Sequence, residues 1–134
     1  NPACVSACPA NVITKRKEDG IVVVDREDCL GKDNCSLCVQ ACPYHAPQFG
    51  AEENAKIQMC NFCLDRWAEG KEPICVAGCP MRALDAGPLC ELVAKYGDIK
   101  QAQGFVYSSE IKPSVTFKPK APCLYSGSQN SPSG

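Results

Sequence analysis

The apolar positions of this chain fall in short runs separated by polar loops. Residues 12–15 and 21–24 are rich in β-branched side chains and flank a polar loop ending in Asp19-Gly20, which predicts a β-hairpin. A short helical turn is expected at 36–41, stopped by Pro43, and another within 64–74, closed by Gly70. Residues 44–50, which include Pro47, are interpreted as a loop, and the polar residues 52–57 are interpreted as solvated. Small hairpins and short helices predict an α+β fold.

The clearest helix covers residues 88–97. Pro88 stands where a first helical residue belongs, and Gly97 stands just after the last turn. One apolar stripe at helical spacing joins Leu89, Leu92, Val93 and Tyr96. Beyond the helix, apolar residues alternate with polar residues and prolines, so 98–125 is expected to form an extended C-terminal arm. The Ser- and Gly-rich residues 126–134 predict a disordered tail.

Composition narrows the function classes. The chain has 134 residues, which suggests one domain or two small ones, and 14 basic against 15 acidic side chains give a net charge of −1. This balance gives no electrostatic basis for binding nucleic acid or an anionic membrane surface. The longest purely aliphatic run, Ile21–Val24, is far too short to span a membrane. With 12 cysteines, sulfur chemistry is expected to organise the fold more than apolar packing does.

The spacing of the cysteines indicates iron–sulfur clusters. At positions 4/8, 38/42 and 75/79, two cysteines stand four residues apart and proline follows the second. Bacterial ferredoxins use C-x2-C-x2-C-x3-C-P, in which three thiolates hold one [4Fe–4S] cluster and the Cys-Pro thiolate reaches another. Soft thiolate sulfur suits such centres. Two alternatives stay open: a disulfide framework, which gives no reason for the prolines, and a Cys4 zinc site, which would explain one run only.

The ferredoxin rule assigns the cysteines to clusters. One cluster takes Cys8, Cys29, Cys35 and Cys38, so its ligand set is complete; a second takes Cys4 and Cys42; a third takes Cys60, Cys63 and Cys75; and Cys79 reaches a fourth. Because the sequence starts inside a cysteine run, we expect an N-terminally truncated fragment, with the remaining ligands upstream. Three proline-flanked runs cannot form closed pairs, which predicts a further run and four clusters in the intact protein.

Some positions depart from the ferredoxin pattern. Five residues separate Cys29 from Cys35 where two are usual, so Cys29 is the least certain ligand, and Asp28 or Asp33 is the alternative. Cys90 and Cys123 belong to no run and are interpreted as free thiols. His45, the sole histidine, is interpreted as a loop residue; no nucleophile–base pair is apparent in the sequence.

The motifs resemble those of a known family. N-P-A-C-V-S-A-C-P at 1–9, C-S-L-C-V-Q-A-C-P-Y at 35–44, C-N-F-C-L-D-R at 60–66 and E-G-K-E-P-I-C-V-A-G-C-P at 69–80 are similar to the iron–sulfur (B) subunits of the dimethyl sulfoxide reductase family of molybdenum oxidoreductases. The segment 82–120, and its arm above all, looks most like the B subunits of the anaerobic dimethyl sulfoxide reductases. In such proteins Gly usually follows the tyrosine at position 44, where this chain has His45.

The resemblance implies a ferredoxin-like fold in which residues 1–87 form the C-terminal part of a four-cluster domain. It implies a non-catalytic subunit that relays electrons from a quinol-oxidising membrane anchor to a molybdopterin catalytic subunit in anaerobic respiration. Attachment to the membrane, at its periplasmic or cytoplasmic face, would then be through partner subunits. A soluble polyferredoxin and a zinc-binding interaction module are the rival readings.

Overall fold

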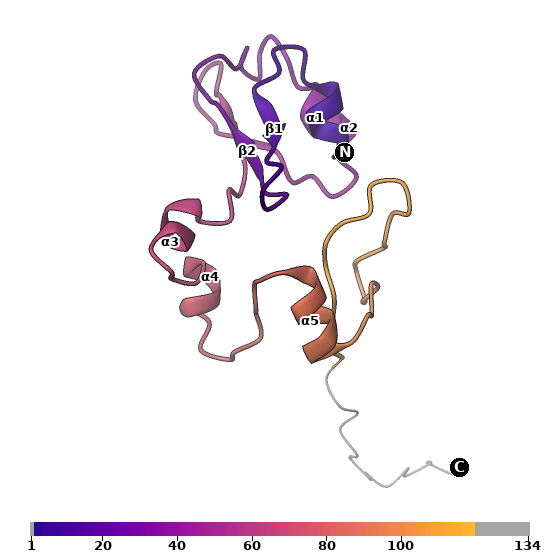
Figure 1. The fold of residues 1–134 in the computed structure, drawn as a ribbon. Coiled ribbons are helices and arrows are strands. Elements are labelled where there is room, and N and C mark those ends of the chain that lie inside the picture. The colour runs from indigo at the N-terminus through magenta and orange to yellow at the C-terminus, as the bar shows by residue number, and fades with distance from the viewer. Residues whose placement is uncertain (1, 120–134) are drawn as a thin grey trace, which may run out of the picture. The chain divides into compact units, whose positions relative to one another are not determined.

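The structure is a computed structural model that describes residues 2–119 (Figure 1). The chain divides into two compact units, which within this range comprise 2–86 with 109–111 and 87–108 with 112–119. The end of the expected arm, the expected tail at 126–134 and Cys123 lie outside the described residues. The domain limits derived from the sequence stay a prediction.

The elements are short. The helices are α1 (Ala3–Ala7), α2 (Leu37–Ala41), α3 (Leu64–Ala68), α4 (Ile74–Ala77) and α5 (Leu89–Tyr96), and the strands are β1 (Ile13–Lys15), β2 (Val22–Val24), β3 (Gln48–Phe49) and β4 (Ile57–Gln58). Each sheet has two strands, so the expected α+β class is confirmed. None of the helices within residues 2–119 has both the length and the apolar character needed to cross a membrane.

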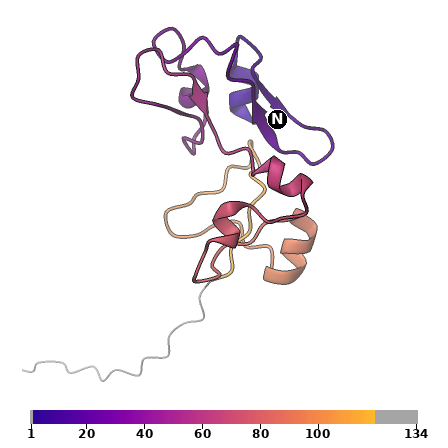
Figure 2. The ribbon, with the colours of Figure 1, turned by 90° about the vertical axis from the view of Figure 1, so that its left-hand side faces the viewer.

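The first hairpin forms where the sequence predicts it. β1 and β2 are antiparallel, with Ile13 opposite Val24. The loop closes around Gly20, whose φ of 75° favours glycine, and the Asp19 carboxylate accepts a hydrogen bond of 2.9 Å from the backbone N–H of Ile21. Both ribbon views place α1 beside this hairpin (Figures 1 and 2), against which it packs.

A second hairpin was not expected. β3 pairs with β4 where the sequence predicted a loop at 44–50 and a solvated segment at 52–57, and Ile57 is buried with only 1% of its surface exposed. Each strand has two residues, which is too short for an alternating pattern to be visible. The solvated interpretation of residues 52–57 is therefore wrong, because Ala55 and Ile57 are both buried.

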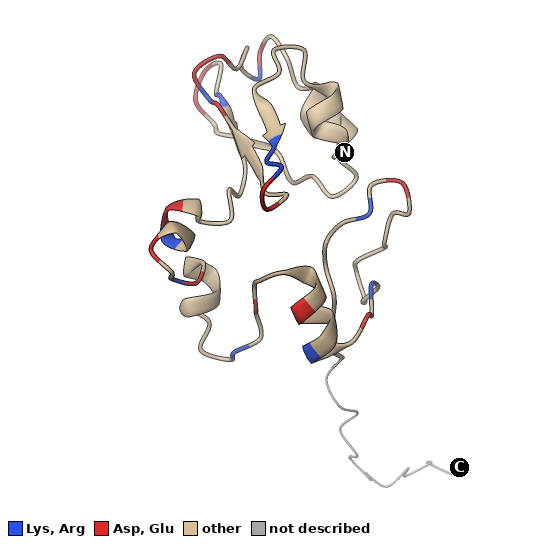
Figure 3. Ribbon diagram, in the orientation of Figure 1, with Lys and Arg blue, Asp and Glu red and all other residues tan. Residues whose placement is uncertain are grey.

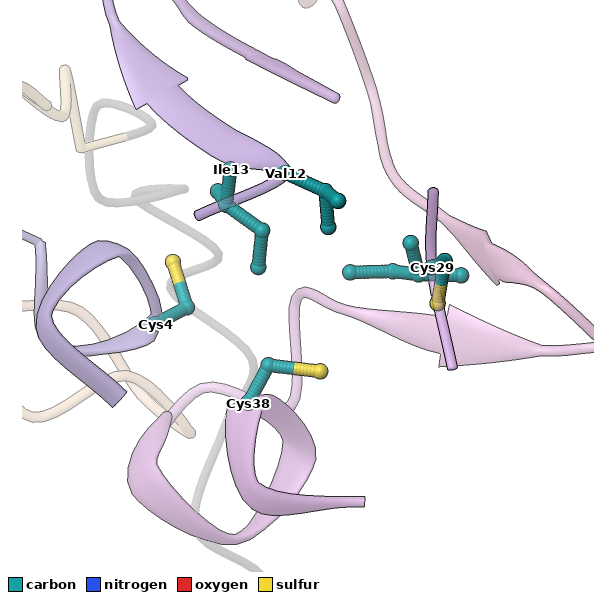
Figure 4. Close-up of a cluster of buried hydrophobic side chains, with 6 residues drawn as sticks. Cys4, Val12, Ile13, Cys29 and Cys38 are labelled. Carbon is teal, nitrogen blue, oxygen red and sulfur yellow. The ribbon is translucent and has the colours of Figure 1, made fainter. Parts of the chain in front are cut away.

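Sulfur supplies half of the main buried cluster. Its members are Cys4, Val12, Ile13, Cys29, Cys38 and Ile57. They come from α1, from β1 and the residue before it, from the start of the second cysteine run, from α2 and from β4. Lying between these elements, the core links both hairpins to both helices, and α1 packs directly against α2 (Figure 4).

In the second unit, the segment after α5 folds back on the end of that helix. The Phe117 N–H donates a 2.8 Å hydrogen bond to the Ile99 carbonyl, and the Thr116 hydroxyl donates to the Gly97 carbonyl. The rings of Phe105 and Phe117 lie 5.2 Å apart, centroid to centroid. Within residues 98–119 no strand forms beyond an isolated bridge between Ala102 and Phe105.

Candidate metal centres

Two equivalent helix ends position the cysteines of the first two runs. Cys4 is the second residue of α1 and Cys8 follows its last; Cys38 and Cys42 hold the same positions in α2. The residue before proline is pushed out of the helical region, and ψ is accordingly 110° at Cys8 and 112° at Cys42. Each Cys-Pro step therefore ends its helix and directs the second sulfur differently from the first.

All three Cys-Pro runs end in the same backbone turn. The residue three positions after the cysteine has a left-handed backbone, with φ of 54° at Asn11, 50° at His45 and 50° at Arg82. In each case its N–H donates to the carbonyl of the cysteine, at 3.2, 3.1 and 3.2 Å. His45 therefore occupies a turn position that favours glycine, which accounts for it as a loop residue.

One cavity is lined by all four cysteines predicted to share a cluster. It has a volume of about 310 Å³, including the space at its mouth, and its remaining lining is apolar. The lining residues are Cys8, Pro9, Ala10, Val12, Ile13, Cys29, Leu30, Cys35, Cys38, Phe49 and Ile57. Figure 4 shows the Cys38 sulfur turned away from Cys4 and toward the side on which Cys29 lies. Cys29 lines this cavity, whereas Asp28 and Asp33 do not.

The pKa values of Cys38 and Cys4 are raised by different neighbouring thiols. Burial, with the adjacent Cys35 and Cys8 thiols, raises the pKa of Cys38. Burial, with Cys42 and more weakly Cys8, raises the pKa of Cys4. Cys4 thus has Cys42, its predicted partner in the second cluster, as its main charged neighbour. Because thiolate is the metal-binding form, iron must displace the protons that these buried thiols would otherwise keep.

The donor set of the cavity, four cysteines among apolar side chains, fits an iron–sulfur cluster. The cysteines within residues 2–119 are all free thiols. In the same range no three His, Cys, Asp or Glu side chains converge closely enough to hold one metal ion. In a [4Fe–4S] cluster each thiolate binds a different iron, so its ligands stand farther apart than those of one tetrahedral zinc. Sulfurs spread around an apolar cavity match the cluster.

The cysteines of the third run are more exposed than those of the first two runs. Cys60 and Cys75 are exposed, and Cys63 and Cys79 are half-buried. The backbone N–H of Ala83 donates to the Cys79 sulfur at 3.4 Å, and this bond, with weaker ones from Met81, Leu84 and Arg82, lowers the pKa of Cys79. Donors aimed at sulfur stabilise the thiolate, which is the form that binds metal, so these bonds would favour Cys79 as a ligand.

Sequence reasoning missed the environment of the extra residues between Cys29 and Cys35. Lys32 donates from its backbone N–H to Ala55 at 2.9 Å and from Nζ to the Gly50 carbonyl at 3.1 Å. The Asp33 carboxylate accepts a 2.5 Å bond from the Asn54 N–H, so it is directed at the β3–β4 loop. No local sequence signal could identify these partners, because they lie about 20 residues downstream, a separation beyond any local pattern.

A lysine also touches a candidate ligand directly. The Lys56 ammonium donates a hydrogen bond to the carbonyl oxygen of Cys29, in a partly buried contact across 27 residues of chain. Figure 3 shows Lys and Arg residues interspersed with Asp and Glu along the ribbon.

Comparison with known proteins identifies relatives among reductase subunits. A family model described as a 4Fe-4S dicluster domain matches residues 1–89. The chain is 46% identical over 121 residues to the B subunit of anaerobic dimethyl sulfoxide reductase of Escherichia coli, covering 90% of this chain and 57% of that protein. The corresponding subunit of Haemophilus influenzae is 38% identical over 127 residues, covering 95% and 60%.

A relative from a different reductase shares the same region. The thiosulfate reductase electron transfer subunit of Salmonella typhi is 45% identical over 96 residues, which cover 68% of this chain and 45% of that protein. The chain spans somewhat more than half the length of the two dimethyl sulfoxide reductase subunits that it matches.

Proposed function

Because this protein belongs to the family of 4Fe-4S dicluster domains, we propose that it is an electron-transfer subunit of a membrane-associated reductase. Electrons pass through its [4Fe–4S] clusters, one at a time, between a quinol-oxidising membrane anchor and a molybdopterin catalytic subunit in anaerobic respiration. No residue of this chain is assigned substrate chemistry. The chain reaches the membrane only through its partners.

One observation carries the proposal: Cys8, Cys29, Cys35 and Cys38 line a single apolar cavity. Cys8 comes from the first run and the others from the second, which is the sharing that the ferredoxin arrangement requires. An apolar wall around a cluster limits solvent access, which is one means by which a protein sets a reduction potential.

The other ligand sets extend beyond one site. We propose that Cys4 and Cys42 bind a second cluster, that Cys60, Cys63 and Cys75 bind a third, and that Cys79 reaches a fourth. These cysteines leave each of the three sets short of four thiolates, so each set would need further ligands. The names of the relatives support this assignment, since one is itself called an electron transfer subunit and two are B subunits of a reductase.

The test is metal content and spectroscopy on the full chain purified without oxygen. We expect iron and acid-labile sulfide in equal amounts, with about four of each for the complete site, and an EPR signal that develops on reduction. Cys38→Ser should lose this site, whereas Cys90→Ser, a change at an exposed thiol outside the runs, should keep it.

Other outcomes of these measurements would favour a zinc-binding module or a soluble polyferredoxin. Zinc without sulfide would identify a zinc-binding module and contradict the proposal. Clusters in a protein that never co-purifies with a large molybdenum subunit would identify a soluble polyferredoxin instead.

A further inference from the structure

We propose that Lys56 is a positioning residue for the cluster bound by Cys8, Cys29, Cys35 and Cys38, and that its charge raises the reduction potential of that cluster. The inference rests on the proposed function. It concerns a side chain that belongs to no cysteine run and that lies in the segment joining the two strands of the second hairpin.

The first step is the contact itself. The Lys56 ammonium donates to the carbonyl oxygen of Cys29, and both residues are at least partly buried, Cys29 with only 8% of its surface exposed. A charge-assisted hydrogen bond is stronger and more directional than a neutral one, the more so away from water. Lys56 thereby fixes the backbone that carries the Cys29 sulfur toward the cavity.

The second step is the need for such a restraint. The connection from Cys29 to Cys35 is longer than the usual two residues, so by itself it would hold Cys29 more loosely. The structure attaches this connection to the β3–β4 loop at several points. They are Lys32 N–H to Ala55, Lys32 Nζ to Gly50, Asn54 N–H to Asp33 and Asn34 Nδ2 to Asn54 Oδ1.

The close approach of the two loops also depends on one glycine. Gly31 has a φ of 83°, and a Cβ built there would come within 2.0 Å of Asn54 Oδ1. The inserted segment, residues 30–34 between Cys29 and Cys35, therefore packs in a defined position against the β3–β4 loop. Lys56 is the member of this interface that bonds to the ligand residue itself.

The third step is charge. Reduction adds one negative charge to a cluster that already bears thiolates, so a nearby cation stabilises the reduced form and raises the potential. Within the inserted segment, Lys32 and Asp33 carry opposite charges that largely cancel at a distance. Lys56 instead directs its ammonium at a neutral carbonyl and contributes its charge from a partly buried position.

The experiment compares Lys56→Gln, Lys56→Arg and Lys17→Gln in the full chain prepared anaerobically. Lys17 lies in the exposed loop of the first hairpin, so Lys17→Gln changes the net charge equally without touching a ligand. The readout is the midpoint potential in an EPR-monitored titration. The relevant signal is assigned as the one absent from Cys38→Ser.

For Lys56→Gln we expect an approximately tenfold fall in the ratio of reduced to oxidised cluster at a fixed potential, which is a shift of about 59 mV for one electron. Lys56→Arg should keep the midpoint potential close to that of the unmodified chain, and Lys17→Gln should leave it unchanged. Faster loss of iron to a chelator in Lys56→Gln, again rescued by Arg, would report the positioning role.

Each remaining outcome has a defined meaning. An unchanged potential and unchanged iron loss in Lys56→Gln would overturn the inference while leaving the cluster, and hence the proposed function, intact. A variant that fails to assemble the cluster supports the inference only if Lys56→Arg assembles it; failure of both overturns the charge-based role. Absence of any cluster in the unmodified chain would contradict the proposed function instead.

Discussion

Residues 2–58 and residues 60–86 use the same Cys-Pro turn but bury the other cysteines of their runs to different extents. In the first region Cys4, Cys29 and Cys38 are buried with Ile13 and Ile57. In the second, Cys60 and Cys75 are exposed, and large apolar side chains lie at the surface: Ile74 is 62% exposed, Met81 82% and Leu84 52%.

The difference shows what the turn can and cannot do. The turn orients a Cys-Pro sulfur from local sequence alone, and it is the same in both regions. Burial requires a second run and the two hairpins, which only the first region combines. A cysteine run thus specifies ligand direction by itself, whereas the environment of a cluster depends on contacts distant in sequence.

The largest expected effect separates the two regions through their ligands. Cys38→Ser should destabilise residues 2–58 by about 3 kcal/mol or more, because it removes both a core residue and a metal ligand. Cys75→Ser should change the stability of residues 2–58 by no more than about 0.5 kcal/mol, because Cys75 is exposed and lies outside that region. Hydrogen exchange of the β1 and β2 amides measures both changes. Equal acceleration in the two variants would contradict the distinction.

The intermediate effect compares two glycines, one from each region. Gly31→Ala and Gly70→Ala both place a side chain at positive φ, 83° and 70°, which costs about 1 kcal/mol. At Gly31 the new Cβ would also meet Asn54, whereas at Gly70 it meets nothing within 4 Å. We therefore expect Gly31→Ala to cost about 2 kcal/mol or more in denaturant unfolding and Gly70→Ala about half as much. If the two variants lost similar amounts of stability, the Gly31 and Asn54 loops would move apart at no energetic cost.

The smallest effect tests what the regions share. His45→Gly and Arg82→Gly should each stabilise the protein by about 0.5–1 kcal/mol, because they relieve a left-handed backbone. Asn11→Gly should gain less, since asparagine tolerates this conformation. Thermal unfolding of the cluster-loaded protein measures all three. If only one of the first two substitutions stabilises, the turns are not equivalent in energy.

The parts of the fold that sequence could predict are those fixed by neighbouring residues. The β1–β2 hairpin follows from its β-branched runs and Asp19-Gly20, and α5 from its apolar stripe between proline and glycine. The grouping of Cys8 with Cys29, Cys35 and Cys38 as ligands stays a prediction from a spacing rule that already encodes a long-range contact, and these four residues line one cavity.

The parts that sequence could not predict depend on tertiary packing. Strands β3 and β4 are too short to show a period, so the burial of Ile57 was not visible. The docking of the inserted segment and the contact between Lys56 and Cys29 join residues about 20 to 27 positions apart. Lysine ordinarily lies in solvent, so its sequence pattern gave no reason to place it on a ligand.

The recurrence of one corner after every Cys-Pro has a consequence for how such a molecule can grow. A segment that carries its own Cys-Pro turn also carries the geometry that orients a sulfur. Duplication of the segment would therefore add a further cluster site without requiring a new backbone turn. The distance over which such a protein could transfer electrons would then depend on how many of these cysteine segments it contains. The proposed adjustment of a single cluster would then fall to side chains outside the turn, such as Lys56, which contacts Cys29 from the segment between β3 and β4.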